Sequence, residues 1–124
     1  MMDGTRKKVL LVEDDPALGE MYRGVLRMSG FDVAHVVDGL PALQLLESEL
    51  PDLIVLDMTL PVLPGDDLLR EIAARRDLRQ IPAIVVTGTD IPLDAAVEQA
   101  KQILRKPCSP DRLVSVVEHY VRAA

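Results

Sequence analysis

Chemically capable side chains stand directly after the apolar runs of this chain. The runs at residues 9–12, 53–56 and 83–86 lead into an acidic triplet, an aspartate and a threonine, and a shorter apolar pair leads to a lysine. These residues are Glu13, Asp14, Asp15, Asp57, Thr87 and Lys106. Short apolar runs separated by helix-like patterns are typical of parallel strands that are buried on both faces. Because ligands bind beyond the carboxyl ends of such strands, we expect these side chains to converge at one edge of a sheet.

The chemistry that these residue types allow is cation binding and phosphoryl transfer. Carboxylates that share a crevice repel one another, and a divalent cation relieves the repulsion. A site with oxygen ligands only suits Mg²⁺, with Mn²⁺ as a substitute, and does not suit zinc. Asp57 is the predicted nucleophile, because an aspartate can accept a phosphoryl group covalently. The metal and Lys106 would hold the phosphoryl oxygens from two sides, and Thr87 would donate a hydrogen bond to a third oxygen.

The elements that must position these residues follow from the periodicity of the chain. Asp15 and Asp38 suit helix N-caps, and Gly30 suits the left-handed residue that ends a helix. We expect strands at residues 9–12, 31–37, 53–56, 83–86 and 103–104, and helices within 16–29, 39–50, 65–77, 93–100 and 110–121. Right-handed crossovers then give an α/β fold, a doubly wound five-stranded parallel sheet of order 2-1-3-4-5 with five helices. The switch point between strands one and three would place Asp14 beside Asp57.

Size and charge restrict the class of protein. The 124 residues suit one domain, expected to span 1–124 with an ordered core at about 7–122. A net charge of −6 disfavours a nucleic acid or an anionic membrane as a direct partner. The apolar stretches are too short to span a bilayer, and the first residues lack a signal peptide's apolar core, so we expect a cytoplasmic protein. Cys108 is the only cysteine and is interpreted as a small apolar filler.

The motifs taken together resemble the response regulator receiver domain of two-component signalling, the CheY-like branch of the flavodoxin-like folds. The resemblance rests on Leu-Val-Glu-Asp-Asp-Pro at 11–16, Leu-Asp-Met-Thr-Leu-Pro at 56–61 with Gly65, Val-Thr-Gly at 86–88 and Lys-Pro at 106–107. Each motif alone is weak, but their order and their places at strand ends are specific. The resemblance covers essentially the whole chain.

The resemblance implies a role for each site residue. Asp57 would be the phosphoacceptor, Asp14 a direct Mg²⁺ ligand, Glu13 a ligand through water, Thr59 a ligand through its backbone carbonyl, Thr87 the switch hydroxyl and Lys106 the phosphate-binding lysine. The phosphoryl donor would be a phosphohistidine on a sensor histidine kinase or a phosphotransfer protein, or a small phosphodonor. The chain would catalyse only its own phosphorylation and dephosphorylation, and would therefore be a signalling switch and not an enzyme acting on other substrates. A downstream protein would bind the face formed by helix four, strand five and helix five.

Three departures from the family pattern bear on that picture. Ile103 occupies the position of the family's aromatic switch residue, which alters the expected coupling to the output face. The segment between Thr87 and Lys106 is short and lacks the usual Ala-Gly-Ala turn, so we expect helix four to be short or irregular. Pro64, in place of a polar residue, should stiffen the loop after Asp57.

Other classes of function fit the sequence less well. A degenerate receiver that binds a protein without phosphorylation is disfavoured, because every residue of the site is present. A Mg²⁺-dependent aspartyl phosphatase of the haloacid-dehalogenase type needs a second aspartate where Thr59 stands, and the acidic triplet would repel the phosphate of a flavin. His35 and His119 are interpreted as ordinary surface residues. The kinase, target, stimulus, phosphorylation lifetime, oligomeric state and relation to a larger regulator or hybrid kinase stay open.

Overall fold

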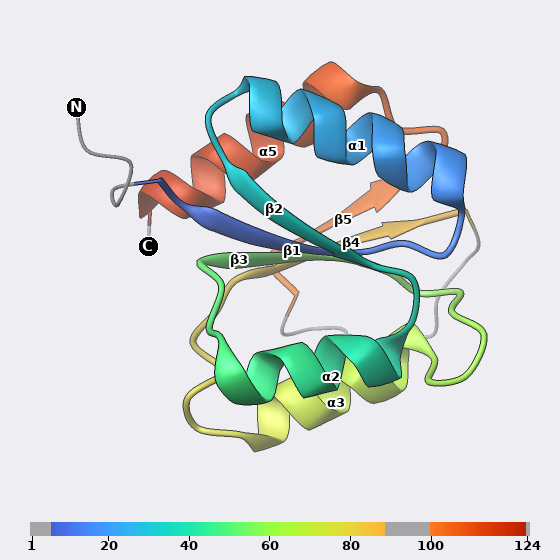
Figure 1. The fold of residues 1–124 in the computed structure, drawn as a ribbon, viewed down its shortest axis with the longest axis vertical. Coiled ribbons are helices and arrows are strands. Elements are labelled where there is room, and N and C mark those ends of the chain that lie inside the picture. Colours follow the sequence, from blue (N-terminus) through green and yellow to red (C-terminus); the bar gives the residue numbers. More distant parts are fainter. Residues whose placement is uncertain (1–5, 89–99, 124) are drawn as a thin grey trace.

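A five-stranded parallel sheet lies between two layers of helices in the computed structural model, which describes residues 6–88 and 100–123 (Figure 1). The strands are β1 (Lys8–Val12), β2 (Asp32–Val36), β3 (Leu53–Asp57), β4 (Ala83–Thr87) and β5 (Gln102–Arg105). Their order is β2-β1-β3-β4-β5, and every neighbouring pair is parallel. This confirms the predicted sheet and its switch point between β1 and β3.

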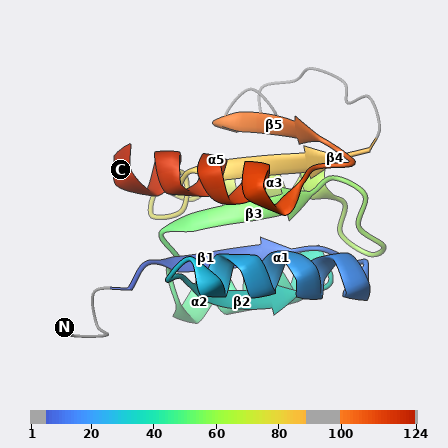
Figure 2. The ribbon, with the colours of Figure 1, turned by 90° about the horizontal axis from the view of Figure 1, so that it is seen from above.

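The described residues contain four helices, two on each face of the sheet. They are α1 (Pro16–Met28), α2 (Gly39–Ser48), α3 (Gly65–Ala74) and α5 (Pro110–Ala123). Figures 1 and 2 show α1 and α5 side by side over one face and α2 and α3 over the other. The short or irregular fourth helix expected from the sequence falls mainly on residues 89–99, which lie outside the described residues. None of the described helices is long and apolar enough to cross a membrane.

Each central strand contains an unbroken run of four apolar residues because both faces of the sheet are covered. Val9 and Leu11 of β1 belong to the core beneath α1 and α5, whereas Leu10 and Val12 belong to the core against α2 and α3. The same alternation continues through β3 and β4, whose residues are all buried. Successive side chains of a strand point to opposite faces, and both faces are buried here. Each central strand therefore needs consecutive apolar residues, which explains the apolar runs in the sequence.

The predicted capping residues lie at both ends of α1 and at the start of α2. Asp15 Oδ1 accepts hydrogen bonds from the backbone N–H groups of Ala17 and Leu18, at 3.0 and 3.2 Å. Asp38 Oδ1 accepts one from the N–H of Gly39 at 2.6 Å, at the start of α2. Gly30 follows α1 with a φ of 98°, a conformation that side chains rarely adopt. These caps orient the loops that carry the acidic residues.

Candidate functional site

The register of the sheet places the ends of β1, β3 and β4 at one level. Val12 pairs with Leu56, so the next residues along β1 and β3 are Glu13 and Asp57. Asp57 in turn pairs with Val86. On the far side of β4, the Lys106 N–H donates to the Thr87 carbonyl at 2.8 Å, directly after the last β4–β5 pair. Four of the predicted site residues therefore meet where these strands end.

Asp57 is the last residue of β3 and its side chain is buried, with 3% of the residue exposed. Its Oδ1 accepts a hydrogen bond from the backbone N–H of Thr59 at 3.0 Å. Its Oδ2 accepts one from Lys106 Nζ, also at 3.0 Å. A backbone N–H and an ammonium group thus fix the plane of the carboxylate, which holds both oxygens in a defined direction.

Lys106 bridges two buried carboxylates. Besides the contact with Asp57, its Nζ lies 3.2 Å from Glu13 Oε1. Burial by itself would lower the pKa of Lys106, but the hydrogen bonds and charges of Asp57 and Glu13 outweigh it and raise the pKa above its ordinary value. The ammonium group therefore stays charged at neutral pH. Gly88 lies beside the lysine stem, and a Cβ there would make an ordinary van der Waals contact with Lys106 Cβ at 3.8 Å.

Glu13 is the most buried carboxylate of the group, with only 2% of the residue exposed. Burial raises its pKa to about 7, and the negative charge of Asp57 acts in the same direction. The hydrogen bond from the Asp15 N–H to Oε2, at 3.1 Å, and the contact with Lys106 oppose the rise without cancelling it. A cation near Glu13 would favour its charged form.

A group of three carboxylates fits a small divalent cation. Glu13, Asp14 and Asp57 each offer one oxygen, and these oxygens all lie within 4.8 Å of one another. Asp14 is exposed, so water can reach the group, whereas the other two carboxylates are buried. The donors are hard oxygens with access for water, which is the set that Mg²⁺ prefers and that Mn²⁺ also accepts. Asp15 caps α1 instead, in agreement with its omission from the predicted metal site.

Thr59 and Thr87 both follow Asp57 in the chain, but they differ in exposure and in their contacts. Thr59 is exposed in the loop after β3, and its N–H is bonded to the Asp57 carboxylate. Thr87 is fully buried at the end of β4 and is tied through its carbonyl to Lys106. The peptide bond that follows, between Lys106 and Pro107, is cis.

Comparison with known families adds an independent observation to this geometry. Residues 9–118 match the family model of the response regulator receiver domain. The chain belongs to this family. It is 36% identical to the DNA-binding response regulator MtrA of Mycolicibacterium smegmatis over 98% of its own length and 53% of that protein's length. The chain therefore spans about half the length of these curated relatives.

Solved structures of other receivers share the fold. The signal receiver domain of a signal transduction histidine kinase from Syntrophus aciditrophicus has a TM-score of 0.85 at 31% identity, with 95% of this chain and 92% of that chain covered. The receiver domain of the sensor histidine kinase PA1611 from Pseudomonas aeruginosa has a TM-score of 0.85 at 30% identity, with 95% and 99% covered. The latter structure has a magnesium ion coordinated in its active-site cleft.

Asp38 has a second role in this receiver that the sequence did not indicate. Its buried Oδ1 accepts hydrogen bonds from the N–H groups of Leu63 and Val62, at 3.1 and 3.4 Å, in addition to capping α2. It thereby ties the loop after Asp57 to α2. At the end of that loop Gly65 packs so closely that an added Cβ would lie 2.6 Å from the Asp57 carbonyl oxygen. An aspartate at a helix start signals a cap, but its contacts 24 and 25 residues away leave no local signal.

The interpretation of His35 as an ordinary surface residue is wrong. His35 is half-buried, its Nε2 lies 2.9 Å from the carbonyl oxygen of Glu13, and its ring packs against Gly19 of α1. His119, by contrast, is exposed, as expected. Cys108 is half-buried against the core, and burial raises the pKa of its thiol, in keeping with its interpretation as a filler. Ile103 lies on the edge strand β5 with 37% of the residue exposed.

Proposed function

We propose that this receiver accepts a phosphoryl group on Asp57 in a Mg²⁺-dependent reaction and acts as a phosphorylation switch for a protein partner. One observation carries the proposal: the Asp57 carboxylate is buried at a strand end, in contact with Lys106 and within a carboxylate group that fits a divalent cation. Family membership supports the same conclusion. No second function is favoured by an observation in the described structure.

The transfer step uses groups that are already in place. An Asp57 oxygen attacks the phosphorus of the donor, a P–O bond forms, and the P–N bond to the donor imidazole breaks with its electron pair left on nitrogen. The product is an acyl phosphate on Asp57. Lys106 exchanges its contact with the carboxylate for one with a phosphoryl oxygen, since its ammonium group is charged and within reach. The Thr87 hydroxyl is the proposed donor to another phosphoryl oxygen. Hydrolysis later returns Asp57 to its carboxylate.

Glu13, Asp14 and Asp57 are the proposed holders of the cation, with the Thr59 backbone carbonyl as a further ligand. When bound, Mg²⁺ supplies positive charge that offsets the charge of the phosphoryl oxygens during transfer. Mn²⁺ would substitute because it accepts the same donors. Family membership is the ground for proposing Asp14 as a direct ligand and Glu13 as a ligand through water.

The proposed partners follow from the chemistry of the site and from the relatives. A phosphohistidine on a sensor histidine kinase or a phosphotransfer protein is the proposed donor, and small phosphodonors would serve in vitro. A protein that recognises the face of β5, α5 and the segment before β5 is the proposed target. The negative net charge of the chain does not favour direct nucleic-acid or membrane binding by this domain. We place it in the cytoplasm as a signalling switch, with no other substrate.

Intact-protein mass spectrometry after incubation with acetyl phosphate and MgCl₂ tests the proposal. We expect the gain of one phosphoryl group, absent in an Asp57→Asn variant and absent when EDTA replaces MgCl₂. Because some receivers do not use small donors, Mg²⁺-dependent binding of beryllium fluoride is measured in parallel. Failure of both reactions in folded wild-type protein would refute the proposed phosphorylation.

A further inference from the structure

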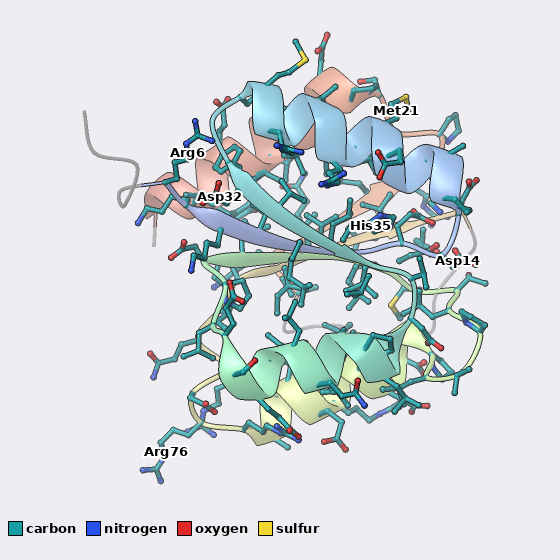
Figure 3. The ribbon with its side chains drawn as sticks, in the orientation of Figure 1. Arg6, Asp14, Met21, Asp32, His35 and Arg76 are labelled. Carbon is teal, nitrogen blue, oxygen red and sulfur yellow. The ribbon has the colours of Figure 1, made fainter. Side chains whose placement is uncertain are left out.

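The side chain of His35 lies between the sheet and α1 (Figure 3). Gly19 of α1 leaves room for its ring. It pairs with Leu11, whose side chain faces the core beneath α1. A Cβ added at Gly19 would clash with His35 Cε1 and Nε2. Any side chain at position 19 would therefore displace the imidazole. The ring fits against α1 because residue 19 has no side chain.

The imidazole of His35 is hydrogen-bonded to the backbone of Glu13. Its Nε2 is 2.9 Å from the Glu13 carbonyl oxygen, and a carbonyl can only accept, so Nε2 carries the proton and donates. The N–H of Glu13 donates to the carbonyl of Val36 at 3.0 Å. Both polar groups of the Glu13 backbone are thus bonded to β2, one residue beyond the end of β1.

The Glu13 carbonyl belongs to the peptide group that joins Glu13 to Asp14. Fixing that peptide plane fixes the directions in which the two carboxylate side chains leave the backbone. We infer that His35, whose ring packs against Gly19, is a positioning residue for the carboxylate group of Glu13, Asp14 and Asp57. The inference rests on the proposed function in one respect, since its effect on Mg²⁺ affinity presupposes that the group binds Mg²⁺.

The size of the expected effect follows from preorganisation. A loop that is already held in its binding geometry loses less freedom when a ligand binds. Residues that orient the ligands of a metal, without contacting the metal, change affinity by about 10- to 100-fold when replaced. Here Val36 still holds one side of the Glu13 backbone. We therefore expect loss of the His35 hydrogen bond to weaken Mg²⁺ binding by about tenfold, the lower end of that range.

Two substitutions separate the hydrogen bond from simple filling of space. His35→Gln keeps an N–H donor at nearly the reach of Nε2, whereas His35→Met has a similar length and volume without a donor. We titrate each ¹⁵N-labelled variant with MgCl₂ and follow the backbone amides by NMR. We expect the Met variant to bind Mg²⁺ about tenfold more weakly and the Gln variant to recover most of the wild-type affinity. Equal affinities of the Met variant and wild type would overturn the inference.

A second pair of substitutions tests the packing of the ring against Gly19 without changing His35. Gly19→Ala should displace the imidazole and weaken Mg²⁺ binding in the same way as His35→Met. Gly24→Ala is the matched control, because Gly24 lies in the same helix and a Cβ there meets nothing within 4 Å. In a His35→Met background, Gly19→Ala should have no further effect on affinity. Equal Mg²⁺ affinities of the Gly19→Ala and Gly24→Ala proteins would contradict the proposed role of the packing between His35 and Gly19.

The metal-free spectra keep this inference distinguishable from the proposed function. In EDTA, His35→Met should shift the amide nitrogen of Asp14, whose peptide group includes the Glu13 carbonyl, and His35→Gln should largely restore it. If wild-type protein binds no Mg²⁺, the proposed function fails, and the metal-free shift still decides whether His35 holds the loop. Unchanged Asp14 and Asp15 amides in a folded Met variant would show that it does not.

Discussion

The stability of the metal-free protein should fall as pH rises, because Glu13 is buried. Burial raises the pKa of Glu13 from 4.5 to about 7, so the folded protein holds this proton more tightly than the unfolded chain does. Between these two values the unfolded chain binds fewer protons, and raising the pH therefore favours unfolding. The stabilisation is complete below the unfolded value and is lost as pH rises toward about 7.

The magnitude follows from linkage between the two pKa values. For a single site with pKa values of 4.5 and about 7, raising the pH from about 5 to about 8 lowers the free energy of unfolding by about 2 to 3 kcal/mol. If the carboxylate group binds Mg²⁺ as proposed, the cation should reverse this loss at the higher pH, because it would bind the charged carboxylate and stabilise the folded state by mass action.

Urea unfolding in EDTA, followed by circular dichroism at constant ionic strength, measures this effect. Other groups also titrate in this range, so wild type is compared with Glu13→Gln, which cannot ionise at position 13. The difference in free energy of unfolding between the two proteins should change by about 2 to 3 kcal/mol across the pH range, with unchanged m-values. A difference that stays constant with pH, or that changes with the opposite sign, would refute the reasoning.

Three further substitutions test other contacts of the site. Lys106→Met should slow phosphorylation by acetyl phosphate at least about tenfold yet tighten Mg²⁺ binding, because the ammonium competes for the same carboxylates; unchanged rates would contradict its role. Asp38→Ala should lower the free energy of unfolding by about 2 kcal/mol, since it removes the acceptor for three backbone N–H groups, and Asp38→Asn should lose less. Gly65→Ala should destabilise by about 1 to 3 kcal/mol through its clash with the Asp57 carbonyl, whereas Gly24→Ala should not destabilise; equal urea midpoints would argue against that contact.

The local sequence pattern determined the sheet and the chemistry of its edge. Apolar runs as short as four residues predicted the central strands, because burial on both faces demands them, and capping residues such as Asp15 marked the helix starts. The alternation of strands and helices then predicted the parallel strand order that the structure shows. The residue types at the strand ends predicted which carboxylates would meet, and the structure brings together Glu13, Asp14, Asp57 and Lys106.

Only the tertiary structure decided which residues hold that edge in place. His35 reaches the Glu13 carbonyl 22 residues away because β2 pairs beside β1 and because Gly19 of α1 leaves space for the ring. Asp38 reaches the loop after β3 because α2 packs beside it. Periodicity and capping are encoded within a few neighbouring residues, whereas these contacts depend on how separate elements are seated against one another. A histidine or an aspartate carries no local signal of which distant backbone group it will bind.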